Sequence, residues 1–269
     1  MATPRHVLRG IDVYSGRVAL AGPMRELGQF YRMGADVAVG LFRTRFQVQE
    51  FLEQSWMIAR VSIVPTVLVA VPFTVLVSFT LNILLREIGA ADLSGAGAAL
   101  GAVTQVGPVV TVLIVAGAGA TAIAADLGSR TIREEIDAME VLGIDPINRL
   151  VIPRVVASTV VALLLNGLVC VIGIAGGYAF SVFLQGVNPG AFVEGITLLT
   201  GLPEVALSMV KAALFGMLAG LVACYRGLSV RGGPKGVGEA VNETVVYAFM
   251  ALFVVNTIVT AVGIRLTAG

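Results

Sequence analysis

The chain has 269 residues, of which 57% are hydrophobic and only 13% charged, and its formal net charge is +1. Soluble domains carry about 25% charged residues, so the composition excludes an ordinary soluble protein. The nearly neutral charge balance also gives no basis for binding nucleic acid.

An amphipathic helix is predicted over residues 24–46, after a polar tail. Arginines are interspersed there with apolar residues at helical spacing: Leu27, Phe30, Tyr31, Val37, Leu41 and Phe42. Such a helix is typical of the membrane interface, where basic side chains meet lipid headgroups. The alternative is a helix packed on the protein's own loops. Residues 1–56 are thus predicted to be a tail and interfacial helix, with Trp56 anchoring the entry into the membrane.

Five long segments beyond residue 60 are almost free of charge. They are residues 61–85, 93–125, 155–193, 205–225 and 244–264, and Lys211 is the only Asp, Glu, Lys or Arg within them. About 20 apolar residues in a helix cross the roughly 30 Å hydrocarbon core. Barrel strands need only about ten alternating residues, so these segments are too long for strands. The sequence therefore predicts an all-α membrane protein, with five transmembrane helices within residues 57–269.

Prolines and glycines mark several of these spans. Pro65 and Pro72 predict a kink in the first span. Small residues allow close approach of helices in lipid, and they recur as Gly95, Gly97 and Gly101 in the second span, Gly173, Gly176 and Gly177 in the third, and Gly216 and Gly220 in the fourth. The pattern does not distinguish packing within one chain from a subunit interface.

The segment between the second and third spans, residues 126–154, is predicted to contain a short helix over about 131–142. Thr131 and Glu134 fit a capping box at its start. Gly143 can end the helix, and Pro146 prevents its continuation. Its apolar stripe is Ile132, Ile136, Met139 and Leu142, and its acidic surface is Glu134, Glu135, Asp137 and Glu140.

The apolar stripe must be covered by the membrane, by the protein's own helix ends or by a partner. The acidic surface argues against the membrane, because the inner leaflet is anionic. The sequence favours a partner, with Ile136 and Met139 in its groove and the carboxylates against its basic residues.

Lys211 is the exceptional residue of the fourth span. A charge near the centre of a membrane helix costs at least about 2.5 kcal/mol, so such residues usually face a cavity or a partner. The alternative is that the long side chain reaches the outer interface. No acidic residue lies in any span, which leaves an anionic lipid head, a carboxylate or a partner subunit as counter-ion.

Lysine and arginine are concentrated on one side of the predicted spans. They occur before the first span and in segments 126–154 and 226–240, whereas only Arg86 and Arg265 lie on the other side. Positive residues stay cytoplasmic. We therefore expect a multi-pass protein of the cytoplasmic (inner) membrane, with its N-terminus in the cytoplasm and its C-terminus outside.

The sequence offers no catalytic or metal-binding motif. The glycine-rich segment 232–236 lacks the P-loop spacing and the Ser or Thr after Lys235. His6 is the only histidine, and Cys170 and Cys224 fall in apolar spans, where buried thiols are expected rather than a disulfide. The chain is predicted not to be an enzyme and to hold no metal or cofactor, so any ATP hydrolysis must come from another chain.

Three stretches together resemble one family of membrane proteins. They are residues 117–128, residues 134–154 with the runs Glu-Glu-Ile-Asp-Ala-Met, Gly-Ile-Asp-Pro and Pro-Arg, and residues 225–242. This combination is similar to the coupling-helix region of MlaE/YrbE permeases, the membrane subunits of ABC transporters for lipids. The resemblance runs from about residue 25 to the end, and the pattern most resembles the A-type YrbE permeases of Mce lipid-import systems.

The resemblance implies an MlaE-like fold with an N-terminal interfacial helix, five transmembrane helices and a cytoplasmic coupling helix. It implies a second YrbE-type permease in an A–B heterodimer, two ABC ATPase subunits that bind ATP and Mg, Mce lipid-binding proteins and lipid as cargo. The implied ATPase-coupling residues are Thr131, Glu134, Glu135, Ile136, Asp137, Met139, Glu140, Gly143, Asp145 and Pro146. Related permeases have a basic residue near the lipid pocket, which favours Lys211 in the substrate path.

Two other functions are compatible with a polytopic membrane protein. A secondary transporter predicts mid-span carboxylates, broken helices or inverted repeats, and the sequence shows none. A membrane scaffold predicts that loss of the loop helix has no functional effect. Fatty acids, mycolates, sterols and phospholipids all stay open as cargo.

Overall fold

The structure is a computed structural model that describes residues 21–43 and 46–267. Within these residues every regular element is a helix, and five helical segments are long and apolar enough to cross a membrane. The prediction of an all-α protein with five membrane-spanning helices is confirmed.

The spans follow one another in chain order. Span one is α2 (Val48–Glu87), and span two comprises α3 (Ser94–Gly101), η2 (Ala102–Val106), α4 (Gly107–Ile114), η3 (Val115–Gly119) and α5 (Ala120–Ile132). Span three comprises η4 (Ile147–Val151), α7 (Ile152–Ala179) and η5 (Phe180–Leu184); span four is α9 (Leu202–Leu228), and span five is α10 (Pro234–Thr267). The short elements are α1 (Ala21–Arg43), η1 (Ala91–Leu93), α6 (Glu135–Val141) and α8 (Pro189–Ile196).

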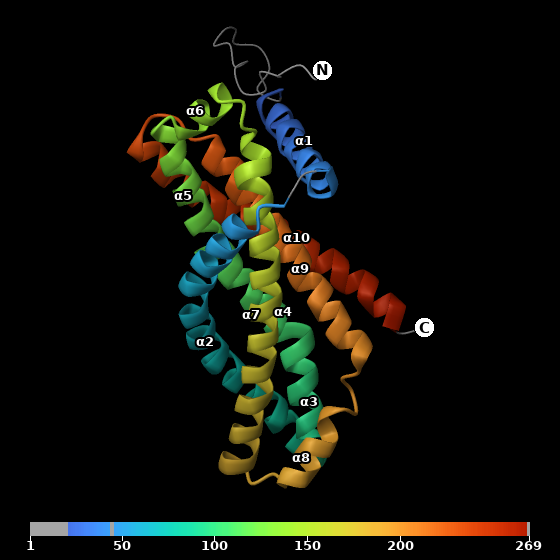
Figure 1. The fold of residues 1–269 in the computed structure, drawn as a ribbon. Helices are drawn as coiled ribbons and strands as arrows, with labels where there is room; N and C mark the ends of the chain where they lie inside the picture. The colour runs from blue at the N-terminus through green and yellow to red at the C-terminus, as the bar shows by residue number, and fades with distance from the viewer. Residues whose placement is uncertain (1–20, 44–45, 268–269) are drawn as a thin grey trace.

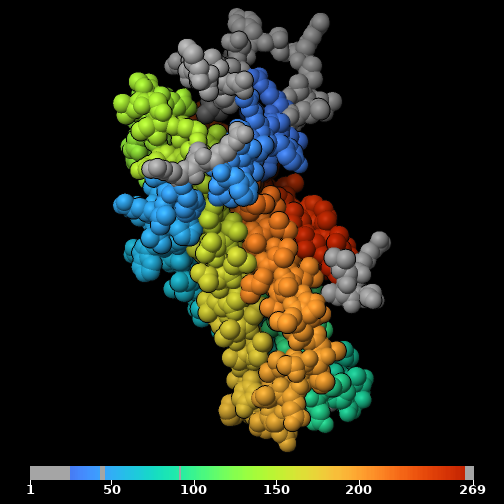
Figure 2. All heavy atoms as spheres, turned by 45° about the vertical axis from the view of Figure 1, so that its right-hand side comes forward, coloured from blue at the N-terminus to red at the C-terminus, as the bar shows by residue number. Residues whose placement is uncertain are grey.

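The fold is organised around α7, which runs along most of the molecule (Figure 1). Helix α6 lies at one end of the molecule and α8 at the opposite end, and we call these the α6 end and the α8 end. Helices α2 and α9 both pack against α7, and Figure 2 shows α9 beside α7 over a long stretch of the surface.

Span one buries a single row of side chains. The row has a spacing of four and consists of Gln54, Ile58, Ser62, Thr66, Ala70, Thr74, Ser78 and Asn82. A spacing of four forms the ridges by which helices interlock, and small polar side chains bring membrane helices close. Asn82 Nδ2 donates a hydrogen bond to Ser181 Oγ of η5 at 2.7 Å. Helix α2 continues through both prolines, so a kink there stays a prediction.

Several glycines of the spans allow close packing within the chain. A Cβ at Gly216 would lie 2.5 Å from the carbonyl oxygen of Ser158, and one at Gly173 would lie 2.8 Å from Ala102 Cβ. Ser158 Oγ also donates a hydrogen bond to the Gly216 carbonyl at 2.7 Å. The GxxxG pair of span four, Gly216 and Gly220, therefore contacts α7 of the same chain, which decides the ambiguity that the sequence left.

The predicted N-terminal helix is present as α1, three residues earlier in the chain than expected. Met33 and Val37 are buried in the core, whereas Tyr31 and Phe42 on its other side are exposed. One side of α1 thus packs on the protein and another exposes aromatic rings. The expected boundary between residues 56 and 57 falls inside α2, and the predicted tail over residues 1–20 lies outside the described residues.

The outer faces of α2 and α10 are apolar and uncovered. Only 22% of the most apolar stretch of α2, and 11% of that of α10, is buried. Leu68, Leu76, Met250 and Ile258 are among the exposed side chains. Apolar surface of this extent is unfavourable in water, which fits contact with lipid.

Candidate functional site

Helix α6 is held between two tight backbone turns. Before it, Glu134 has a positive φ of 60°, and after it, Gly143 has a φ of 75°. The Gly143 amide donates to the Glu140 carbonyl at 3.0 Å, and the Ile144 amide donates to the Met139 carbonyl at 2.9 Å. This left-handed turn ends the helix as predicted for Gly143.

The predicted capping box is wrong. Thr131 lies inside α5, where its Oγ1 donates to the Leu127 carbonyl at 2.9 Å and to the Gly227 carbonyl of α9 at 3.1 Å. Glu134 is the N-cap residue of α6 and makes no side-chain cap. Packing of α5 against α9 extends α5 through Ile132, so the separate helix covers Glu135–Val141 instead of 131–142.

The apolar stripe is divided between the interior and the surface. Ile136 is only 5% exposed and belongs to the core, and Met139 packs against that core. The burial of Ile136 contradicts the expectation that it fills a partner's groove, whereas Met139 is only partly buried and its predicted contact with a partner stays a prediction. Val141 and Leu142 are instead 88% and 74% exposed. The apolar contact that α6 offers to another molecule is therefore made by Val141 and Leu142.

Acidic residues lie near this exposed pair along the chain. Glu134, Asp137 and Glu140 are exposed, whereas Glu135 Oε1 forms an ion pair with Arg133 Nε at 2.7 Å. Charged groups around a small apolar contact can position a basic partner surface. We name the set Asp137, Glu140, Val141 and Leu142 the α6 surface.

Asp145 and Pro146 shape the entry into span three. Asp145 Oδ1 accepts a hydrogen bond from the backbone amide of Ile147 at 3.0 Å, and Oδ2 accepts one from the side-chain Nδ2 of Asn148 at 2.5 Å. The bond from Ile147 satisfies a backbone amide at the beginning of the helix. Pro146 is the residue before η4 and has helical backbone angles. These two residues thus begin the next helix, and they do not lie on the α6 surface.

Lys211 is buried in span four, far along the chain from α6. It is 3% exposed, and no hydrogen bond or ion pair joins it to another described residue. One turn away on the same helix, Ser208 Oγ accepts a hydrogen bond from Asn166 Nδ2 of α7 at 2.9 Å. Asn166 Oδ1 is buried without a partner in the described part of the chain. Lys211 therefore lies in the protein interior rather than on an exposed surface.

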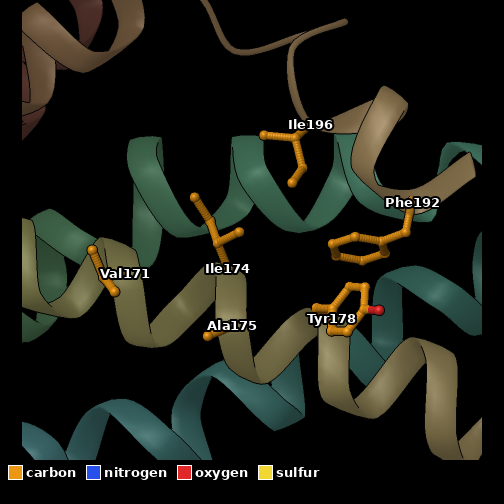
Figure 3. Close-up of a pocket in the computed structure, with 6 residues that line it drawn as sticks. All are labelled: Val171, Ile174, Ala175, Tyr178, Phe192 and Ile196. Atoms are coloured by element: carbon orange, nitrogen blue, oxygen red, sulfur yellow. The ribbon is translucent and has the colours of Figure 1, made fainter. Parts of the chain in front are cut away.

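Two apolar pockets lie in the α8 half of the molecule, and neither is lined by Lys211. One has a volume of about 400 Å³ and is lined by Val171, Ile174, Ala175, Tyr178, Phe192 and Ile196 (Figure 3). The rings of Tyr178 and Phe192 meet edge to face at 5.4 Å. The other has a volume of about 610 Å³ and lies between α2 and η5, beside Phe79 and Phe180. Walls of this kind accept hydrocarbon.

Two buried or half-buried arginines at the α6 end were not assigned a role from the sequence. Arg154 forms ion pairs with Glu50 and Asp126. Arg226 forms ion pairs with Glu26 at 3.4 Å and Glu243 at 3.0 Å. A charged residue at the end of an apolar span signals such a pair, but its partners come from distant parts of the chain and only the fold reveals them.

Comparison with known proteins adds to this geometry. The sequence matches the family described as Permease MlaE over residues 51–262. It is 32% identical to a probable ABC transporter permease protein of Synechocystis sp. over 234 residues, which cover 86% of this chain and 88% of that protein. It is 28% identical to the intermembrane phospholipid transport system permease protein MlaE of Haemophilus influenzae, over 61% of this chain and 63% of that one. It is also 29% identical to the chloroplastic protein TRIGALACTOSYLDIACYLGLYCEROL 1 of Arabidopsis thaliana, over 58% of this chain and 45% of that protein.

Proposed function

The chain belongs to the MlaE permease family, and from this premise we propose that it forms the membrane path of an ATP-driven lipid transporter. The observation that carries the proposal is the family match over residues 51–262, which includes α6, Lys211 and nearly all of the five spans. A relative over most of its length is named as an ABC transporter permease, and a more distant one as a phospholipid transport permease.

ATP is hydrolysed by a separate protein. Two cytoplasmic ABC ATPase subunits bind ATP and Mg, and one of them docks on the α6 surface. In support, α6 exposes Val141 and Leu142 beside Asp137 and Glu140 at one end of the spans. Protein interfaces commonly have apolar side chains at their centre and polar or charged side chains at their rim.

The finer assignment follows the sequence pattern. The α6 end faces the cytoplasm, α8 and the C-terminus face outward, and the protein resides in the inner membrane. The partner is a second YrbE-type permease, so that the chain is the A-type subunit of an A–B heterodimer. Mce proteins outside the membrane deliver the lipid, and transport is inward. The distribution of arginine and lysine supports this orientation.

Lys211 is proposed to bind the anionic head of the lipid. It is a buried cation without a partner among the described residues, and a buried charge is costly unless it is paired. A lipid phosphate or carboxylate would supply the missing charge. The apolar pockets of the α8 half accept hydrocarbon and would hold acyl chains on the way to Lys211.

Reconstitution of the purified complex tests the proposed function. The complex is placed in vesicles of phosphatidylcholine and phosphatidylglycerol that contain a fluorescent phospholipid, and lipid movement is measured with and without Mg-ATP. ATP-dependent movement is expected. Movement driven by an ion gradient without ATP would establish a secondary transporter, and the absence of both, with a correctly assembled complex, would favour a scaffold.

Charge reversal on the α6 surface should release the ATPase. In the double variant Asp137→Lys and Glu140→Lys, we expect ATPase co-purification to fall at least tenfold, since charge pairs at interfaces contribute on the order of 1.5–7 kcal/mol and about 1.4 kcal/mol is a factor of ten. Glu135 is left intact because it pairs with Arg133 within the chain.

Leu142→Asp should have a similar effect, and Leu198→Asp serves as the matched control. Leu198 is also exposed, but it lies after α8 at the opposite end. Pull-down of the ATPase from solubilised membranes measures both variants. Equal co-purification of the two leucine variants would show that α6 is not the docking surface.

A further inference from the structure

Arg154 forms a buried charge centre at the α6 end. Its side chain is fully buried, yet Nη2 lies 2.6 Å from Asp126 Oδ2 of α5, and Nη1 lies 3.1 Å from Glu50 Oε1 of α2. Nη1 also donates a hydrogen bond to the Leu150 carbonyl of η4 at 3.0 Å. The charge centre, which we define as Glu50, Asp126 and Arg154, therefore joins spans one, two and three.

Adjacent polar groups complete the charge centre. Gln54 Nε2 donates to Glu50 Oε1 at 3.0 Å, and Arg130 Nε lies 3.3 Å from Asp126 Oδ1. Two arginines thus face two carboxylates. Arg154 Nε and Gln54 Oε1 are buried without hydrogen-bond partners among the described residues. The charge centre therefore has one hydrogen-bond donor and one acceptor without a partner. A small shift of the helices could give each of them a hydrogen bond.

The charge centre contacts both segments that hold α6. Asp126 and Arg130 lie in α5, which ends at Ile132 just before α6. Arg154 and the Leu150 carbonyl lie in span three, which begins soon after α6 ends. Leu150 is part of η4, a wider π-helical turn, and such turns are frequent at functional sites. A force that displaces α6 must therefore act on both sides of the charge centre.

Stability alone does not account for this arrangement. Taking charges out of water costs about as much as their attraction returns, and apolar residues of similar volume often serve stability as well. Buried ion pairs can instead specify one geometry among several. The charge centre links the segments on either side of α6 to α2. The geometry that it specifies is therefore the position of these segments relative to α2.

We propose that the charge centre transmits the displacement of α6 to span one, so that ATP hydrolysis by the partner stays coupled to lipid movement. Arg154 is then a positioning residue: it holds the ends of α5 and α7 against α2 and exchanges hydrogen bonds when they shift. This inference rests on the proposed function, because it requires an ATPase docked on α6.

A charge-free variant of similar volume tests the inference. In the triple variant Glu50→Gln, Asp126→Asn and Arg154→Met, all three charges are removed together, so no unpaired buried charge is left. The complex is reconstituted in the vesicles described above, and the fluorescent phospholipid moved per ATP hydrolysed is measured. We expect this ratio to fall at least tenfold, while the ATPase rate and the assembly of the complex stay within twofold of the unaltered protein.

Arg226→Met is the matched control. Arg226 also forms two ion pairs at the α6 end, but with Glu26 of α1 and Glu243 of α10, which do not hold α6. In the Arg226→Met variant, the amount of phospholipid moved per ATP hydrolysed should stay unchanged. An unchanged ratio in the triple variant would overturn the inference and leave the charge centre a packing feature.

Two further results separate the possible failures. If the triple variant does not assemble, Arg154→Lys decides, because it keeps the charge and loses the two-pronged geometry: a reduced ratio supports the inference, and a normal ratio overturns it. If the unaltered complex moves no lipid with ATP, the proposed function fails before the charge centre is tested.

Discussion

Replacing Lys211 with Met is expected to lower lipid transport by ten- to a hundredfold while the complex still assembles. Lys211 is 3% exposed and has no partner among the described residues. If it binds the anionic head of the lipid, the variant loses a charge-assisted interaction of about 1.5–3 kcal/mol, and about 1.4 kcal/mol corresponds to a factor of ten. Transport into the vesicles and binding of an anionic lipid to the purified complex measure the effect.

The same variant should make the folded protein more stable. A buried charge without a partner costs at least about 2.5 kcal/mol by membrane-insertion scales, and Met fills a similar volume without charge. We therefore expect a higher unfolding temperature in detergent together with reduced transport. Lys235→Met is the control, because Lys235 is exposed and its one ion pair among the described residues is with Glu239 of the next turn. Normal transport by Lys211→Met would remove Lys211 from the substrate path.

Gly216→Leu is expected to unfold or severely destabilise the protomer. Even the Cβ of an alanine here would lie 2.5 Å from the Ser158 carbonyl oxygen and 2.6 Å from Thr159 Cα, both of which are backbone atoms of α7. The helices must therefore separate. Overpacking typically costs about 1–3 kcal/mol, and a clash with backbone atoms that cannot rotate away belongs at the upper end, about 3 kcal/mol. For a protein of this size that corresponds to a loss of roughly 6–12 °C in unfolding temperature.

Alanine at two glycines provides the control for this prediction. Gly216→Ala should lower the unfolding temperature, whereas Gly117→Ala should leave it unchanged or raise it. A Cβ at Gly117 meets nothing within 4 Å, and alanine favours a helix over glycine by about 1 kcal/mol. The sequence alone left open whether Gly216 packs within one chain or at a subunit interface. Loss of pairing by a fully stable Gly216→Leu protomer would contradict the packing seen here.

The elements that depend on local sequence were predicted well. Runs of more than 20 residues with at most one charge identified all five spans, because a helix in lipid must be predominantly apolar. Gly143 was correctly placed at the end of α6, since a positive φ is a local property that favours glycine. The start of α6 was misplaced, because the hydrogen bond from Thr131 to the Gly227 carbonyl of α9 is not local.

The residues of the candidate site show the same division. The sequence by itself determined that Lys211 is a charge within the membrane, that α6 carries acidic residues and that the chain resembles the MlaE family. Only the tertiary structure decided that Ile136 packs inward while Leu142 points out, that Gly216 contacts α7 of the same chain, and that Arg154 meets Glu50 and Asp126. Apolar periodicity predicts that one side of a helix will be buried. The residues that cover this side are distant along the chain, and their positions are fixed only when the helices pack.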